Sequence, residues 1–141
     1  MIEKGMAIKH AIMNSRTIAH PMEENLSFLY GTIFIDRTPR DGVNSRNVCI
    51  FAEGEVDRSP TGTGVSGRLA LHYASGEISL GELIVIESII GSRFSGRVIK
   101  ATTFGGYPAI IPEVEGTAHL CGRQEFLIDP ADPLKHGFIL R

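Results

Sequence analysis

The segment Asp57–Gly64 reads DRSPTGTG and places an acid, two hydroxyl-bearing threonines and two glycines within a few positions. It lies between a short apolar stretch and a sequence typical of a helix. The first amides of a helix have no partner inside the helix, and the helix dipole adds partial positive charge there. Glycine lets a ligand approach such amides closely, so the segment predicts a site for a carboxylate or a phosphate.

A second group could extend this site. Asp57 could face a cation while the amides of Gly62 and Thr63 hold an anion, and together these groups would suit an amino-acid zwitterion. Two simpler interpretations stay open. Thr63 could cap the helix while the glycines only form the turn, and Asp57 could form a surface ion pair with Arg58, which would contribute little to stability.

Hydrophobic periodicity and turn residues predict the elements that position this segment. A helix over 65–75, ended by Gly76, follows a short strand at 47–52. This helix is apolar on most faces, which indicates burial in the middle of the domain. The predicted class is α+β, a mixed sheet or barrel wrapped around one central helix. The remaining predicted elements are a helix at 2–14, strands at 26–35, 82–90, 93–103, 107–115 and 117–128, and a proline-rich tail ending in a short strand.

Composition excludes several function classes. The chain has 141 residues, 43% of them hydrophobic, and a net charge of −2, which indicates one ordinary globular domain. Without a basic patch we expect neither a nucleic-acid partner nor a membrane partner. The charged N-terminal segment does not resemble a signal peptide, so we expect a cytoplasmic protein.

The cysteines and histidines indicate no metal site. Cys49 and Cys121 both occur in alternating apolar patterns, so each is interpreted as a small buried hydrophobic residue. The histidines lack metal-ligand spacing, and we expect no metal and no cofactor. His20 before Pro21 is expected to shape a turn. His72 is interpreted as a packed core residue, and so is Arg68, although Arg68 could also reach back to pair with a carboxylate. Glu87 is interpreted as a buried carboxylate that needs a partner, and whether it contacts a substrate stays open.

Consecutive motifs along the whole chain resemble the proline racemase family. They are G-M-x-I-K-x-A-I and HP, DRSP-x-GTG-x-S-x-RLA, GE, ESIIGS-x-F-x-GRV and DP-x-DPL-x-x-GF-x-L. The resemblance implies a diaminopimelate-epimerase-like fold of two lobes with the active site between them. The chain would correspond to the C-terminal part only, with an incomplete second lobe over roughly 1–105 and closing strands at 106–141 that return to the first lobe.

The resemblance also suggests the reaction. In racemases and epimerases of this family a cysteine occupies the position of Thr61 and works with a second cysteine. A threonine hydroxyl does not titrate in the range of a thiol, so it is a poor replacement as acid or base. Threonine here is similar to the trans-3-hydroxy-L-proline dehydratase branch. In that branch one thiolate takes the Cα proton and the C3 hydroxyl leaves as water, which gives Δ1-pyrroline-2-carboxylate.

Residue roles follow from the same resemblance. Asp57 would bind the ring nitrogen, the amides of Gly62 and Thr63 would hold the carboxylate, and Thr61 would contact the departing hydroxyl. The first catalytic cysteine of the family lies in a Cys-Gly-His motif, which this sequence does not contain. Neither Cys49 nor Cys121 matches a catalytic position, so neither is assigned as the base.

These considerations lead to expectations for the isolated chain. The helix that begins at Met1 without a capping residue suggests a cut, so we expect half of an active site and no activity alone. Exposed strand edges should make the chain a homodimer, or poorly soluble, unless the missing N-terminal half covers them. The alternatives are a proline racemase or 4-hydroxyproline epimerase, an inactive module that binds proline analogues, and a truncated reading frame without a function.

Overall fold

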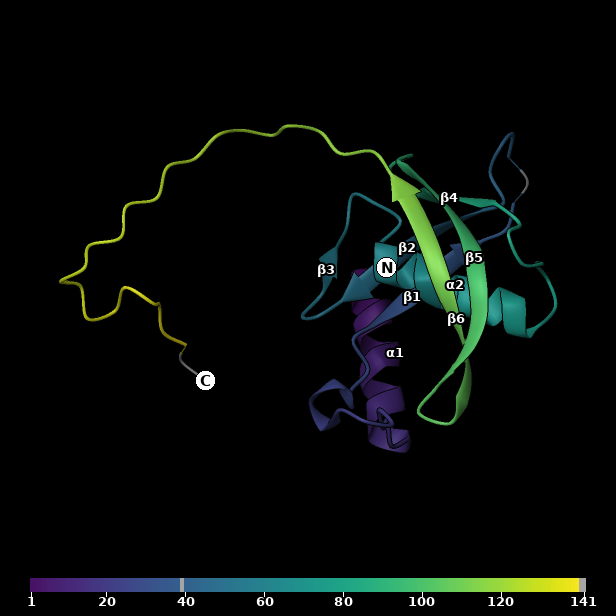
Figure 1. Cartoon of the computed structure of the whole chain (residues 1–141), viewed down its shortest axis with the longest axis horizontal. Coiled ribbons are helices and arrows are strands. Elements are labelled where there is room, and N and C mark those ends of the chain that lie inside the picture. Colours follow the sequence, from purple (N-terminus) through teal and green to yellow (C-terminus); the bar gives the residue numbers. More distant parts are fainter. Residues whose placement is uncertain (39, 140–141) are drawn as a thin grey trace.

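The computed structural model describes residues 1–38 and 40–139, which form a six-stranded mixed sheet with two α-helices and an extended C-terminal tail (Figure 1). The sheet and central helix confirm the predicted α+β class. In chain order the elements are α1 (Ile2–Ser15), the 3₁₀ turn η1 (Glu24–Leu26), β1 (Gly31–Asp36), β2 (Ser45–Phe51), β3 (Glu55–Val56), α2 (Gly62–Ala74), β4 (Ile84–Ser88), β5 (Arg93–Phe104) and β6 (Tyr107–Gly116).

The strand order explains why a helix follows the DRSPTGTG segment. The sheet runs β1-β2-β4-β5-β6, with β3 added to β2, and the pair β2–β4 is parallel while the others are antiparallel. Parallel neighbours need a long crossover connection. Here α2 lies in that connection, so the segment 57–64 enters the crossover helix beside the sheet.

The core lies between α2 and the strands β4 and β5. Gly96 on β5 has no side chain at the contact, and a Cβ there would lie 2.9 Å from Cδ1 of Leu69. The helix therefore approaches the strand closely. The opposite side of α2 is open, because Leu71 is 69% exposed, so the helix is less enclosed than its apolar sequence predicts. The buried cluster is Val65, Leu69, Ile78, Ile84, Ile86 and Val98.

Helix α1 confirms the predicted N-terminal helix and packs on β2. A Cβ at Gly5 would lie 2.7 Å from Cβ of Ile50, so only glycine permits this approach. The amine of Lys9 donates a hydrogen bond to the carbonyl of Ala52 at 2.5 Å. The structure contains the turn expected at His20, whose Nδ1 accepts hydrogen bonds from the following backbone. None of the helices in the described residues is long and apolar enough to cross a membrane.

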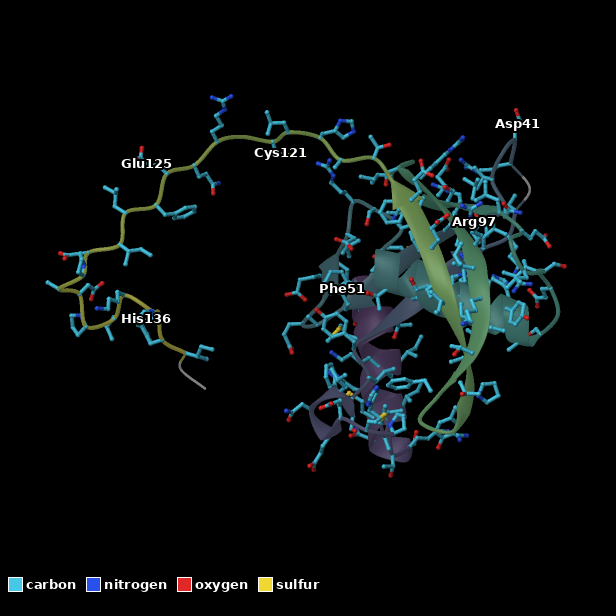
Figure 2. All side chains as sticks on the ribbon, in the orientation of Figure 1. Asp41, Phe51, Arg97, Cys121, Glu125 and His136 are labelled. Carbon is cyan, nitrogen blue, oxygen red and sulfur yellow. The ribbon has the colours of Figure 1, made fainter. Side chains whose placement is uncertain are left out.

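The C-terminal tail differs from the prediction. Residues 117–128 form no strand, and every described residue from 117 to 139 is exposed. Figure 2 shows Cys121 and Glu125 on a segment that runs away from the sheet, so the prediction that Cys121 is buried is wrong. The alternating pattern alone does not form a strand, because a strand needs a paired edge. The predicted final strand does not form in the described residues up to Ile139, and Leu140 and Arg141 lie outside them.

Two smaller differences concern strand limits. The first strand begins at Gly31 rather than at Leu26, because Leu26 ends a 3₁₀ turn and residues 27–30 form no regular element. The short strand β3 was not predicted, since two residues are too few to show a pattern.

Because the described residues of the tail, 117–139, contribute no buried side chain, removal of the tail should leave the fold intact. We expect deletion of 117–141 to change Tm by less than about 3 °C and to reduce self-association. Thermal circular dichroism and light scattering measure these effects. The control deletion of 107–141 also removes β6, and it should abolish cooperative unfolding. A large loss of Tm on removing the tail alone would contradict this expectation.

Candidate functional site

The start of α2 is held in an unusual backbone conformation. Thr61 occupies the N-cap position with φ 66° and ψ 108°, in the left-handed region that a β-branched residue rarely adopts. The amide of Val65 donates the first hydrogen bond of the helix to the carbonyl of Thr61 at 2.9 Å. Such strain is typical of functional sites, where the surrounding structure stabilises it. The helix begins at Gly62, so both glycines lie in its first turn.

The first three amides of α2 lack a partner within the described part of the chain. Among the described residues, none accepts a hydrogen bond from the amide of Gly62, Thr63 or Gly64. Thr63 is inside the first turn and no side chain caps the helix, so the interpretation of Thr63 as a cap is wrong. These amides are available to an anion at the positive end of the helix dipole.

Thr61 and Asp57 are joined by a hydrogen bond. The hydroxyl of Thr61 donates to Oδ2 of Asp57 at 3.0 Å, and the amide of Thr61 donates to Oγ of Ser59 at 3.1 Å. In the described part of the chain Asp57 forms no ion pair within 4.0 Å, so the alternative of an Asp57–Arg58 pair is wrong. The hydrogen bond joins the carboxylate of Asp57 to the N-cap residue of α2.

A pocket of about 440 Å³ lies between α2 and the strands β1 and β2. This volume is within the range of small-molecule sites. Three of the four predicted site residues, Asp57, Thr61 and Thr63, line it, and Gly62 lies between the last two in sequence. Its lining also includes Tyr30, Cys49, Phe51, Gly64, Arg68 and Leu71. An acid and the start of a helix therefore face one cavity, an arrangement that suits a small zwitterion.

The sequence matches a known protein family. A family model described as proline racemase matches residues 1–139. The chain belongs to the proline racemase family.

Relatives in this family carry several names. A trans-3-hydroxy-L-proline dehydratase of Colwellia psychrerythraea is 56% identical over 141 residues. A 3-hydroxyproline 2-epimerase of Burkholderia multivorans is 46% identical over 142 residues. The alignments cover 100% of this chain, but only 40% and 42% of those proteins. The chain therefore spans about two fifths of the length of the curated relatives it matches.

A solved structure shows the same fold. A hydroxyproline epimerase from Agrobacterium vitis with bound trans-4-hydroxy-L-proline superposes with a TM-score of 0.81 at 36% identity. The match covers 99% of this chain and 40% of that protein. The diaminopimelate-epimerase-like fold expected from the sequence is thereby confirmed.

Cys49 is a pocket residue that the sequence motifs did not reveal. It is buried as predicted, and its Sγ donates a weak hydrogen bond to the carbonyl of Pro60 at 3.9 Å. Burial raises the pKa of the Cys49 thiol, and the charge of Asp57 acts in the same direction, while Thr61 and Arg68 oppose it. A thiol with a raised pKa is uncharged at neutral pH and is a poor base. Cys49 is therefore a poor candidate for a catalytic base.

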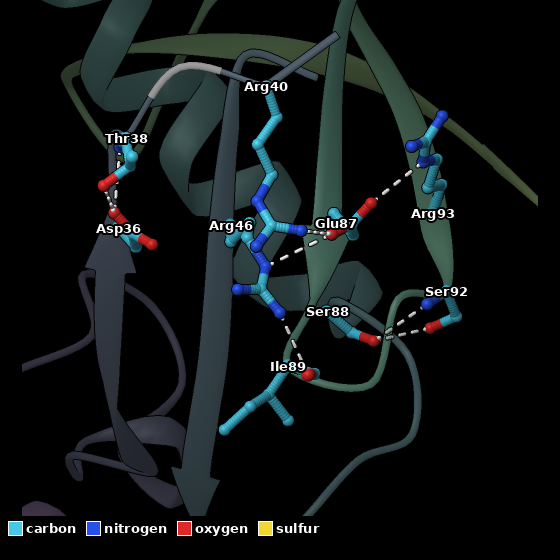
Figure 3. Close-up of polar contacts among 9 residues, drawn as sticks. All are labelled: Asp36, Thr38, Arg40, Arg46, Glu87, Ser88, Ile89, Ser92 and Arg93. Atoms are coloured by element: carbon cyan, nitrogen blue, oxygen red, sulfur yellow. Dashed lines mark hydrogen bonds and ion pairs between the residues drawn. The ribbon is translucent and has the colours of Figure 1, made fainter. Parts of the chain in front are cut away.

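Glu87 is a structural residue remote from the pocket. Its side chain is 6% exposed and contacts three guanidinium groups, as Figure 3 shows. The ion-pair distances are 3.2 Å to Arg40, 3.2 Å to Arg46 and 3.1 Å to Arg93. The partner that a buried carboxylate needs is therefore present, and Glu87 does not line the cavity.

The close approach of α2 to β2 gives a test of the pocket's geometry. A Cβ at Gly64 would lie 2.9 Å from Sγ of Cys49 and 3.1 Å from Cδ1 of Ile33, whereas a Cβ at Gly67 would contact nothing within 4 Å. We expect Gly64→Ala to lower the free energy of unfolding by about 1–3 kcal/mol. Gly67→Ala, the matched control, should raise it by about 0.5–1 kcal/mol, since alanine favours a helix. Urea denaturation measures both, and equal effects would contradict the packing described here.

Proposed function

We propose that this chain supplies the substrate-binding half of a trans-3-hydroxy-L-proline dehydratase. The observation that supports this most directly is the joint position of Asp57, Thr61 and the partnerless first amides of α2 around one pocket. The ring nitrogen of the substrate, positively charged, would bind Asp57. Its carboxylate would accept hydrogen bonds from the amides of Gly62 and Thr63.

The same arrangement suits the proposed chemistry. Removal of the Cα proton moves negative charge onto the carboxylate, and amides at the start of a helix stabilise such charge. The C3–O bond then breaks, and the leaving hydroxide takes up a proton, so that overall the Cα proton and the C3 hydroxyl are lost as one water molecule. Thr61 would hydrogen-bond this leaving group, directly or through water. The remaining enamine becomes Δ1-pyrroline-2-carboxylate without a proton being returned to the opposite face of Cα.

The base is proposed to come from an N-terminal half. The uncharged Cys49 is unsuited to the task, and the relatives are more than twice as long as this chain. In this proposal residues 1–105 are most of the second lobe and residues 106–141 return to the first lobe. Without that half, the chain would be inactive and would form a homodimer through its exposed apolar tail, where Leu120 and Leu127 are 88% and 90% exposed. A cytoplasmic location remains a prediction from the composition.

An epimerase is the second candidate. It is favoured by the 46% identity to the 3-hydroxyproline 2-epimerase of Burkholderia multivorans. The threonine at position 61 argues against an epimerase, because its hydroxyl, which is hydrogen-bonded to Asp57, does not deliver a proton as a cysteine thiol would. An inactive module that binds proline analogues is the remaining alternative.

A complementation experiment separates these functions. The chain is incubated in D₂O with trans-3-hydroxy-L-proline, with and without the separately expressed N-terminal portion of the Colwellia psychrerythraea relative, and followed by NMR. Dehydratase activity predicts Δ1-pyrroline-2-carboxylate only in the complemented sample. Deuterium at Cα with inverted configuration and no loss of water would support the epimerase, and binding without either product would support the inactive module.

The role of Thr61 is tested in the complemented sample. Thr61→Ala should lower turnover at least about tenfold, because one hydrogen bond to the leaving group is lost. Thr61→Ser keeps the hydroxyl and should retain most activity. Full dehydratase activity in the alanine variant would refute the proposed role.

A further inference from the structure

Arg68 is a buried cation whose side chain lines the pocket, while its charged end contacts Ser45 and His72, which line a second cavity of about 210 Å³. It lies one helical turn after Gly64, and the spacing of Gly64, Gly67, Arg68 and Leu71 places all four on the pocket-facing side of α2. The residue is only 3% exposed. The sequence alone favours a packing role for Arg68, and the helical spacing from Gly64 is the signal that places it at the pocket.

The contacts of the guanidinium group are with uncharged partners. Its Nη2 donates to Oγ of Ser45 at 2.7 Å and lies 3.2 Å from Nε2 of His72. A guanidinium only donates hydrogen bonds, so Nε2 of His72 must accept this one. The proton of the neutral imidazole is then on Nδ1, which faces Oε2 of Glu77 at 2.5 Å. Arg68 is therefore held in place by a hydroxyl and a neutral ring.

No carboxylate of the described residues lies within 4.0 Å of the Arg68 guanidinium. Glu77, the acid beyond His72, is also 4.0 Å from Arg37. Nε and Nη1 of Arg68 are buried and have no hydrogen-bond partner. Burial lowers the pKa of Arg68, but a guanidinium keeps its proton in proteins. A buried charge without an ionic partner is costly, and such groups cluster at functional sites.

We propose that Arg68 is a specificity-determining residue that makes the pocket favour ligands with a carboxylate over uncharged analogues. The inference rests on the proposed function, since it assumes that the carboxylate binds at the start of α2. The partnerless nitrogens of Arg68 are closed to solvent, so the charge acts through the protein interior rather than by contact. There the interaction is weakly screened, and the bound carboxylate supplies the missing negative charge. Asp57 would attract the ligand's ammonium at the other end.

Paired ligands and paired variants test this role. Calorimetry compares trans-3-hydroxy-L-proline with its primary amide, which keeps the ring and the amine but lacks the negative charge. Arg68→Gln keeps a donor for Ser45 and His72 but removes the charge, and Arg68→Lys keeps the charge. In the glutamine variant we expect the carboxylate ligand to bind about tenfold more weakly, while the affinity for the amide changes less than about twofold. The lysine variant should retain the preference of the original chain.

The outcomes separate this inference from the proposed function. If the unaltered chain binds neither ligand, both fail. If it binds the carboxylate ligand but Arg68→Gln weakens both ligands equally, or neither, the residue is only structural and the inference is overturned. If circular dichroism shows that the glutamine variant does not fold, the lysine variant tests the inference instead. Arg68→Lys keeps the positive charge, so loss of the carboxylate preference in this variant would contradict a role of the charge. Ser45→Ala, which removes a contact but no charge, should also keep the preference.

Discussion

Asp57→Asn is expected to weaken the binding of trans-3-hydroxy-L-proline to this chain about 30-fold or more, without changing the fold. Asparagine has nearly the same shape, and its side-chain oxygen still accepts the hydrogen bond from Thr61, which spans 3.0 Å in this structure. The variant therefore removes the negative charge that would face the ring nitrogen and little else. Isothermal titration calorimetry measures the affinity, and far-UV circular dichroism reports on the fold.

A matched control separates the local charge of Asp57 from the net charge of the chain. Asp132→Asn makes the same chemical change on the exposed tail, outside the pocket. It should leave the affinity within about twofold, since an exposed distant charge is screened by salt. Equal binding by the Asp57 variant and the original chain would show that the carboxylate does not hold the ligand's amine.

Glu87→Ala is expected to lower the free energy of unfolding by about 3 kcal/mol or more. The carboxylate is 6% exposed, and its removal leaves three guanidinium groups close together without their shared anion. Of the three arginines, Arg46 is expected to account for most of this loss of stability, because its side chain is 23% exposed. Arg40 and Arg93 are 49% and 53% exposed, so solvent screens their charges more strongly. The cluster joins the loop before β2 to the ends of β2, β4 and β5, so its loss should destabilise the packing of all these segments.

Urea denaturation measures the effect, and a surface pair gives its control. Glu113 pairs with Arg97 at 2.6 Å, but both side chains are about half exposed. Glu113→Gln should therefore cost less than about 1 kcal/mol. The two variants would destabilise the chain equally if burial of Glu87 did not matter, and that result would contradict the structural role assigned to it.

The predictions from sequence were accurate where a local rule decides the structure. The two glycines around Thr63 and the apolar residues after them indicate a helix, and α2 forms there, although it begins at Gly62, before the predicted start at residue 65. Glu87 was expected to need a partner because a lone carboxylate is too costly in a core, and three partners are present. His20 precedes a proline, which favours a turn, and its ring completes that turn.

Other features depend on contacts between distant segments, which no local pattern contains. Cys49 and Arg68 share the pocket only because the crossover between β2 and β4 brings the start of α2 against Cys49 of β2. The left-handed backbone of Thr61 was not foreseen, since a β-branched residue disfavours it. Residues 117–128 have the pattern of a strand but lie beside no strand edge, so the strand that the pattern predicts does not form.

Binding of a cyclic amino acid's carboxylate to the first amides of α2 can be observed by NMR titration. With ¹⁵N-labelled chain and trans-3-hydroxy-L-proline, we expect saturable shifts of the amide signals of Gly62 and Thr63, with the same Kd for both. The amides of Gly116 and Gly137, outside the pocket, should not move. Ligand binding that leaves the Gly62 and Thr63 signals in place, or no binding at millimolar ligand concentrations, would contradict this mode of binding.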